Sequence, residues 1–281
     1  MRLGAIDIGS NTVRLLVADV IGGETWRIAD QDQVITRLGE DLARTGALGE
    51  APMARTLAAV RDYVARCAQL GANEIHIVAT SAVREASNGH AFATAVERAT
   101  GRRVDVVSGE TEARLTLLGV RHGLGRLPGL VLTFDIGGGS TEYVLSEGDT
   151  IRSMISLRLG VVPLAERFPF PGRADPARYR ELYDEIRGRL DRELPEAIRS
   201  ARVTHLIGTA GTVTALAALD LGLVRYDPER VQGHVLSRAT IERLLDRLGI
   251  DALRVSDYGL REGVLVDAIE VAHGSRPVAA S

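Results

Sequence analysis

Apolar and polar residues follow two different periods along this chain, and together they predict alternating strands and helices. Short apolar runs predict β-strands at 3–8, 12–20, 75–80, 103–107, 130–136, 141–146, 150–156 and 203–208. A period near 3.6 residues predicts helices at 51–70, 89–100, 109–121, 176–199, 211–221 and 239–248, with a short one near 262–272. This order of elements is typical of an α/β protein.

The order of elements occurs twice. A hairpin followed by helices and strands starts the chain, and the same order begins again after the connector HGLGRLPG at 122–129. Each half opens with a strand, an Asp-Ile-Gly turn and a second strand, at residues 7–9 and 135–137. We therefore predict two duplicated α/β domains, 1–124 and 125–281, with the final helix packing back on the first domain.

Composition narrows the class of protein. With 45% apolar and 25% charged residues the chain resembles an ordinary soluble globular protein, and no apolar run reaches the roughly 20 residues of a membrane helix. The chain starts directly with the strand-like LGAIDIG, so we expect no signal peptide. Cys67 is the only cysteine, which excludes an intramolecular disulfide and favours a packed, reduced thiol. We expect a cytoplasmic protein.

Charge excludes several chemistries. The net charge of −3 would not attract nucleic acid, so an anionic ligand needs a local site. All 34 basic residues are arginine, which excludes a Walker-type phosphate loop and Schiff-base catalysis, because both need lysine. The six histidines show no spacing typical of metal ligands.

The two glycine-containing turns predict phosphate binding. A tight turn after a strand presents several backbone N–H groups on one side, and glycine allows an anion close to the backbone. The aspartate at each strand end, Asp7 or Asp135, can hold Mg²⁺ or a bridging water, and Glu142 supplies another acid nearby. The alternative is a pair of ordinary hairpin turns in which glycine relieves backbone strain. The turn residues are Gly9, Ser10, Asn11 and Thr12 in the first, and Gly137, Gly138, Gly139 and Ser140 in the second.

Three further stretches carry candidate groups. LIGTAGT (206–212) leads from a strand into a helix whose free N–H groups attract anions, although close packing explains its Gly208 and Gly211 nearly as well. In ATSAVREASNG (79–89), Arg84 offers a guanidinium for phosphate oxygens. In SGETEARL (108–115), Ser108 is a candidate N-cap, and Glu112 by position alone stabilises the first helical turn.

Taken in order, these motifs resemble the exopolyphosphatase and guanosine pentaphosphate phosphatase (Ppx/GppA) family. The resemblance is carried by AIDIGSNTVRLLV, ATSAVREASNG, SGETEARLTLLGV, FDIGGGSTEYV, ISLRLGVVPLAERF, LIGTAGTVTALAAL and VSDYGLREGVL. It implies two duplicated domains of the actin, hexokinase and Hsp70-like (ribonuclease H-like) class around an interdomain cleft. It also implies removal of the terminal phosphoryl group from inorganic polyphosphate or pppGpp.

The resemblance assigns roles to residues. Glu112 falls on the family's catalytic glutamate, and Mg²⁺ or Mn²⁺ is implied at Asp135 and Glu142, with Asp7 facing them. We expect no nucleic acid or membrane partner, and we expect a homodimer. The phosphate-binding residues are predicted to be Gly9, Ser10, Asn11, Thr12, Arg84, Gly137, Gly138, Gly139, Ser140, Gly208 and Gly211.

This sequence departs from the family pattern near its end. The Arg-Ala-Asp segment that family members usually carry between helix 239–248 and VSDYGLREG is missing, which puts full activity in question. Two other functions stay open: a phosphotransferase of the same fold that moves phosphate between polyphosphate and a nucleotide, and a non-catalytic binder of polyphosphate or alarmone that the C-terminal compression has made inactive. Intact acids beside the predicted phosphate loops argue against the pure binder, which gains nothing from them.

Overall fold

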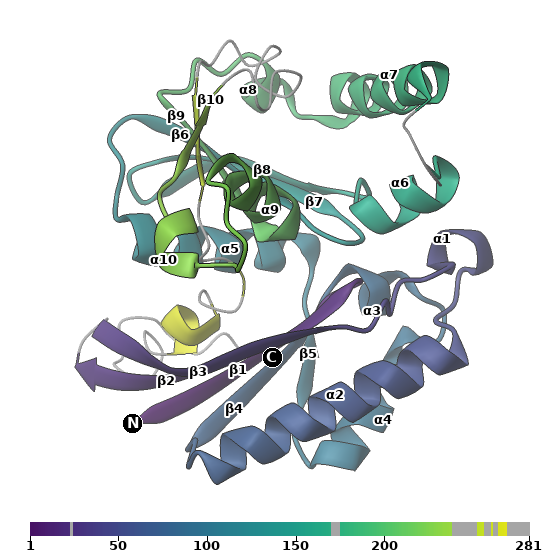
Figure 1. Cartoon of the computed structure of the whole chain (residues 1–281), viewed down its shortest axis with the longest axis vertical. Helices are drawn as coiled ribbons and strands as arrows, with labels where there is room; N and C mark the ends of the chain where they lie inside the picture. Colours follow the sequence, from purple (N-terminus) through teal and green to yellow (C-terminus); the bar gives the residue numbers. More distant parts are fainter. Residues whose placement is uncertain (23–24, 170–174, 238–251, 256–259, 261–263, 269–281) are drawn as a thin grey trace. The chain divides into compact units, whose positions relative to one another are not determined.

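The computed structural model describes residues 1–22, 25–169, 175–237, 252–255, 260 and 264–268 (Figure 1). The chain divides into two compact units, Met1–His122 with Leu260–Ser281, and Gly123–Gly259. The sequence places this boundary after residue 124 instead. The predicted helix 239–248 and the family motif around 256–259 lie outside the described residues, while 264–268, within the predicted short helix, are helical.

A five-stranded sheet forms the first unit, in the order β3-β2-β1-β4-β5. The first three strands of the chain form an antiparallel meander, and the other two add in parallel beside β1. The strands are β1 (Arg2–Ile8), β2 (Thr12–Gly22), β3 (Thr25–Ile35), β4 (Glu74–Ala79) and β5 (Val104–Val106).

Two helices, α2 and α4, pack together on one face of this sheet (Figure 1). Their apolar residues, among them Val60, Cys67 and Phe92, meet alternate strand residues such as Ile6 and Ile77 in a buried core. Burial raises the pKa of the Cys67 thiol to about 11, as the prediction of a packed thiol requires. The helices are α1 (Leu42–Thr45), α2 (Glu50–Gln69), α3 (Ser81–Glu85), α4 (Gly89–Thr100) and α5 (Gly109–Leu124).

The second unit contains a six-stranded sheet in the order β10-β11-β9-β6-β7-β8. Again a three-stranded antiparallel meander comes first, and two parallel strands add beside its first strand. The strands are β6 (Leu130–Ile136), β7 (Thr141–Glu147), β8 (Thr150–Leu157), β9 (His205–Thr209), β10 (Val235–Ser237) and β11 (Ala252–Val255).

The helices of the second unit bury Leu190, Ile198 and Val213 against that sheet. The single helix predicted at 176–199 is wrong, since the chain leaves the helical conformation at Leu194 and Pro195. Proline disfavours the helical conformation of the residue before it, which explains the break. The helices are α6 (Val161–Arg167), α7 (Pro176–Glu193), α8 (Glu196–Arg199), α9 (Ala210–Asp220) and α10 (Pro228–Val231).

Five strands of the second sheet repeat the order and directions of the first sheet, which confirms the predicted duplication. β1, β2 and β3 correspond to β6, β7 and β8, and β4 and β5 correspond to β9 and β11. The antiparallel β10, at the edge of the second sheet, has no counterpart among the described strands of the first. The Asp-Ile-Gly turn joins the first two strands of the meander in both units, so the two turns are structurally equivalent.

Strand β3 is not among the strands predicted from the hydrophobic pattern. It lies at the edge of its sheet, where a strand needs few buried apolar residues. Of its eleven residues only Trp26 is buried, while Ile28, Val34 and Ile35 are exposed.

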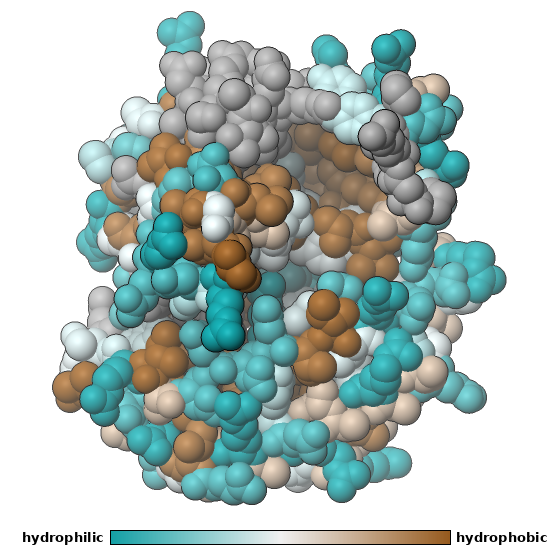
Figure 2. All heavy atoms as spheres, in the orientation of Figure 1, coloured by the Kyte–Doolittle hydropathy of each residue, from teal (hydrophilic) through white to brown (hydrophobic). Residues whose placement is uncertain are grey.

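On the face drawn in Figure 2, apolar residues form separate patches among hydrophilic ones, as is ordinary for protein surfaces. Among the described helices, none is long and apolar enough to cross a membrane.

Candidate functional site

The first glycine turn is held by bonds to its carbonyl groups. The N–H of Gly9 donates to the carbonyl of Thr12 at 3.1 Å, closing the turn. The carbonyl of Ser10 accepts from Gly39 at 2.7 Å, and that of Asn11 accepts from Thr36 and Arg37. Within the described residues, the N–H groups of Ser10 and Asn11 donate to no backbone carbonyl. The turn therefore keeps its donors available for a ligand.

The second turn repeats this arrangement. The N–H of Gly137 donates to the carbonyl of Ser140 at 2.9 Å. Val161 and Val162, at the start of α6, donate to the carbonyls of Gly137 and Gly138. No backbone carbonyl in the described ranges accepts from the N–H of Gly138 or Gly139. Two equivalent turns thus have carbonyls held by hydrogen bonds and successive amides without a backbone acceptor in the described residues, as binding of an anion requires.

A side chain would crowd the first position of both turns, more severely in the first turn than in the second. A Cβ on Gly9 would lie 2.9 Å from the Thr12 carbonyl oxygen, and one on Gly137 would lie 3.2 Å from that of Ser140. Glycine relieves crowding by a carbonyl oxygen here, whereas neither Gly9 nor Gly137 has a positive φ, so the backbone-strain explanation of the hairpin interpretation does not apply to them. Glycine also allows close approach of an anion.

Helix α3 connects the first turn to two predicted site residues. The Oγ of Ser10 accepts from the N–H of Ala82 at 3.1 Å. Two residues later, Nη1 of Arg84 donates to Oε2 of Glu112 at 3.0 Å and to the carbonyl of Val107 at 2.9 Å. Hydrogen bonds and helix α3 therefore link the first turn, Arg84 and Glu112 within the first unit.

Glu112 lies in the first turn of α5, whose cap is the one predicted. Ser108 accepts the N–H of Thr111 at its Oγ and that of Glu112 at its carbonyl. Glu112 is 9% exposed, whereas Glu110 in the same turn is exposed. A carboxylate that only stabilised the helix terminus would do so equally well in solvent, so its burial against Arg84 favours a specific role.

A row of oxygen ligands crosses the second sheet next to its turn. Asp135 on β6 lies directly opposite Glu142 on β7, and Glu142 lies opposite Ser156 on β8, so the three share one face. Glu142 is 2% exposed, and its Oε1 accepts a 2.6 Å hydrogen bond from the Ser156 hydroxyl. Burial, together with the Glu142 charge, raises the pKa of Tyr143.

These oxygen donors fit Mg²⁺, which proteins hold through one or two carboxylates together with water and substrate phosphates. No cluster of three or more histidine, cysteine, aspartate or glutamate residues suited to a metal occurs in the described part of the chain. A site built on Asp135 and Glu142 would therefore depend on oxygens of the substrate.

The equivalent row in the first sheet has a different charge. Asp7 lies opposite Arg14 on β2, at the position that Glu142 has in the other unit. Asp7 is 6% exposed and therefore belongs to the interior of the turn. The paired carboxylates occur only in the second of these two rows, and Asp7 as a metal ligand stays a prediction.

The third glycine turn is tied to the second one. Thr212 donates from Oγ1 to the carbonyl of Ile136 at 3.4 Å, which places the start of α9 beside the Asp-Ile-Gly turn. A Cβ on Gly208 would lie 2.7 Å from Cζ of Phe134, so packing alone requires this glycine. Ala210 adopts a φ of 68°, a conformation that L-residues rarely take. The phosphate-binding roles of Gly208 and Gly211 stay predictions.

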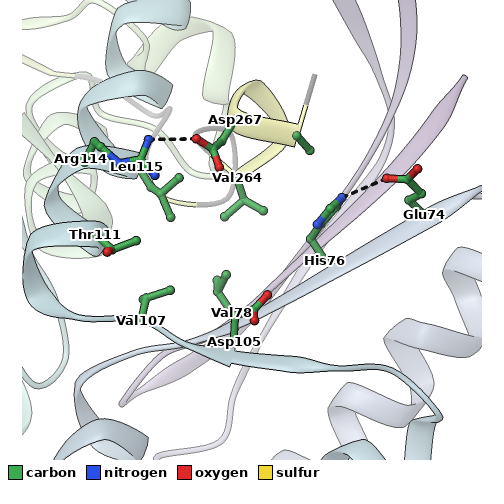
Figure 3. Close-up of a pocket in the computed structure, with 11 residues that line it drawn as sticks. Glu74, His76, Val78, Asp105, Val107, Thr111, Arg114, Leu115, Val264 and Asp267 are labelled. Carbon is green, nitrogen blue, oxygen red and sulfur yellow. Dashed lines mark hydrogen bonds and ion pairs between the residues drawn. The ribbon is translucent and has the colours of Figure 1, made fainter. Parts of the chain in front are cut away.

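A pocket of about 420 Å³ lies elsewhere in the first unit (Figure 3). Among its lining residues, Arg114 pairs with Asp267 at 2.9 Å, and Nε2 of His76 lies 3.5 Å from a carboxylate oxygen of Glu74. None of the predicted site residues lines it. Its lining residues are Glu74, His76, Val78, Asp105, Val107, Thr111, Arg114, Leu115, Val264, Asp267 and Ala268.

The repeat of an Arg-Leu-Gly tripeptide, with one copy beside each turn, was not predicted to be functional. Arg37-Leu38-Gly39 follows β3 and Arg158-Leu159-Gly160 follows β8, so Arg-Leu-Gly occurs once in each unit. Leu38 and Leu159 are buried in the two cores. A Cβ on Gly160 would lie 2.3 Å from the carbonyl oxygen of Gly138, so the segment touches the second turn directly. The occurrence of Arg-Leu-Gly once in each half of the sequence is the signal that could have identified these segments.

Comparison with known proteins gives consistent results. The family model described as "Ppx/GppA phosphatase family" matches residues 16–224. A protein of Mycobacterium tuberculosis named "Exopolyphosphatase 2" is 33% identical over 258 residues, covering 87% of this chain and 78% of that protein. A Vibrio vulnificus protein named "Guanosine-5'-triphosphate,3'-diphosphate pyrophosphatase" is 30% identical, covering 92% of this chain and 58% of that protein.

Solved structures agree. The crystal structure of the Aquifex aeolicus member of the Ppx/GppA family has a TM-score of 0.80 and 31% identity, covering 99% of both chains. An exopolyphosphatase from Cytophaga hutchinsonii, at 24% identity, has the same fold with a TM-score of 0.88, covering 96% of this chain and 98% of that one. The fold is thus the predicted duplicated α/β fold, and it is shared with solved members of the Ppx/GppA family. On this evidence, the chain belongs to the Ppx/GppA phosphatase family.

Proposed function

We propose that this protein releases terminal orthophosphate from inorganic polyphosphate or from pppGpp. The observation that carries the proposal is the set of hydrogen bonds that links the first turn, through α3 and Arg84, to Glu112. Through these contacts the first glycine turn, the guanidinium of Arg84 and the buried carboxylate of Glu112 lie in one unit, which supports their acting on one phosphate. Relatives named exopolyphosphatase and guanosine pentaphosphate pyrophosphatase support the same class of substrate.

In the proposed reaction, water attacks the terminal phosphorus in line with the bridging oxygen. A bond forms between the water oxygen and phosphorus, the bond from phosphorus to the bridging oxygen breaks, and Glu112 accepts a proton from the water. General-base assistance of this kind contributes roughly 10²- to 10⁴-fold to the rate.

The first turn and Arg84 stabilise the negative charge on the transferred phosphoryl group. Backbone amides that are fixed before the substrate binds need no reorganisation during the reaction. Arg84 can serve in two ways, because its guanidinium holds Glu112 in place and carries further N–H donors for phosphate oxygens. In phosphoryl transfer, positioning and charge stabilisation account for most of the catalysis.

We also propose Mg²⁺ or Mn²⁺ as the cofactor, with Asp135 and Glu142 as its main protein ligands. When bound, the cation would supply positive charge to the phosphate oxygens. The hydrogen bond from Ser156 fixes the orientation of the Glu142 carboxylate that this role requires.

The test is phosphate release from short polyphosphate, long polyphosphate and pppGpp in the presence of Mg²⁺. We expect Glu112→Gln to lower kcat by at least about 100-fold, because the amide keeps the shape but cannot accept the proton. Glu110→Gln, in the same helical turn but exposed, is the control and should retain activity. Wild-type turnover in Glu112→Gln would remove Glu112 from the mechanism.

The same assay decides between functions. Formation of ATP from added ADP would indicate the phosphotransferase, and binding without phosphate release would indicate the non-catalytic binder. The homodimer and the cytoplasmic location expected from the sequence stay predictions, and light scattering on the purified chain tests the first.

A further inference from the structure

We infer that Arg37 is a phosphate-binding residue of the first turn, in addition to Arg84. This inference rests on the proposed function, and it adds a specific contact to the substrate site. Arg37 belongs to the Arg-Leu-Gly segment after β3, which sequence reasoning assigned no role.

The backbone of Arg37 is hydrogen-bonded directly to the first glycine turn. Its backbone N–H donates to the carbonyl of Asn11 at 2.9 Å, and the neighbouring Thr36 donates to the same oxygen at 3.0 Å. Two residues later, Gly39 bonds the carbonyl of Ser10. The segment therefore fixes the base of the long Arg37 side chain beside the amides that face the proposed anion.

The side chain of Arg37 has a charge without an acidic partner. It is exposed, and it forms no ion pair with the acids that the structure describes. The nearest acid in sequence, Glu40, pairs with Arg55 at 3.1 Å instead. An exposed guanidinium beside an anion-binding turn is suited to bidentate contact with phosphate oxygens.

The backbone of Arg37 is strained. Its φ is 53°, a left-handed conformation that residues with a Cβ rarely adopt. Within the described ranges only Asp41 and Ala210 share this property among residues other than glycine. Aspartate tolerates the conformation, whereas Arg37 and Ala210 adjoin the predicted phosphate-binding turns. Strain of this kind persists at ligand sites when the surrounding structure over-determines it.

The second unit repeats the arginine. Arg158 precedes Leu159-Gly160 as Arg37 precedes Leu38-Gly39, and it also has an exposed side chain. An arginine kept at the same place beside both turns, while most other residues differ between the two units, is more readily explained by a shared ligand than by packing.

The experiment measures binding of inorganic tripolyphosphate with Mg²⁺ by titration calorimetry, in full-length protein carrying Glu112→Gln to prevent turnover. Adding Arg37→Gln should weaken binding by at least about tenfold, as loss of a charged hydrogen bond does. Adding Arg44→Gln, which removes the same charge from exposed α1 nearby, should change Kd less than twofold. Arg37→Gly should lose the same affinity with an equal or higher Tm, because glycine adopts this φ freely.

The outcomes separate this inference from the proposed function. Equal binding by the Arg37→Gln and Arg44→Gln proteins would overturn the role of Arg37 while leaving the hydrolase intact. A parent protein that neither binds tripolyphosphate nor, with Glu112 restored, releases phosphate would overturn both. A lower Tm in Arg37→Gly would show that Arg37 is retained for folding rather than for a ligand.

Discussion

Ser156 shows how one hydroxyl can determine the geometry of a buried acid. It donates the 2.6 Å hydrogen bond to Glu142, whose side chain is almost completely buried. Without this bond the carboxylate would lose part of its stabilisation, since hydrogen bonds to charged groups contribute about 1.5–3 kcal/mol. We therefore expect a substitution of Ser156 to act through the orientation of Glu142.

We expect Ser156→Ala to raise the Mg²⁺ concentration for half-maximal phosphate release several-fold. It should also lower the affinity for Mn²⁺ measured directly by electron paramagnetic resonance. Ser153→Ala, on the same strand, is the control. Unchanged Mn²⁺ affinity in Ser156→Ala would mean that Glu142 needs no help with its orientation, or holds no cation.

At the scale of elements, each glycine turn depends on a segment that follows the third strand of its meander. Gly160 packs so tightly against the second turn that a methyl group would collide with the backbone of Gly138 and Gly139. Backbone cannot move aside as the end of a side chain can, so the turn itself must shift.

Gly160→Ala should therefore lower kcat/KM by at least about tenfold, through displacement of amides that must be aligned to stabilise charge. Gly22→Ala, where nothing lies within 4 Å of the added carbon, should be close to wild type. The measurement is steady-state phosphate release, with circular dichroism to confirm folding. Normal kinetics in Gly160→Ala would show that the second turn tolerates movement.

Elements with a strong local pattern were predictable from the sequence, and elements defined by distant contacts were not. The strands that carry the turns are apolar and buried, so their pattern indicated them directly. Edge strand β3 is largely polar, and Ser156 meets Glu142 only through strand pairing that no local pattern encodes. The ion pair between Arg84 and Glu112 likewise joins residues 28 positions apart.

At the scale of the whole molecule, the first unit is assembled from two separate stretches of chain. Residues 1–122 combine with 260–281, and within the latter Leu265 is fully buried. Arg114 on α5 also pairs with Asp267 at 2.9 Å. The unit with Glu112 therefore depends on residues more than 130 positions beyond its main stretch.

Leu265→Ala should destabilise the protein by about 2–5 kcal/mol, the usual cost of truncating a buried leucine. Leu219→Ala, at a leucine that is 78% exposed, should change stability by less than about 0.5 kcal/mol. Chemical denaturation followed by circular dichroism compares the two. Equal stability would mean that residues 264–268 add little to the first unit.

The two-part construction of the first unit has a consequence during translation. The second unit is one uninterrupted stretch, so all of its residues are synthesised before the segment that completes the first unit. A growing chain thus contains every residue of the second unit while the unit with Glu112 still lacks its closing residues. A polypeptide released early would keep the complete unit that contains Asp135 and Glu142, but it would have no finished unit around Glu112 with which to degrade a phosphate polymer.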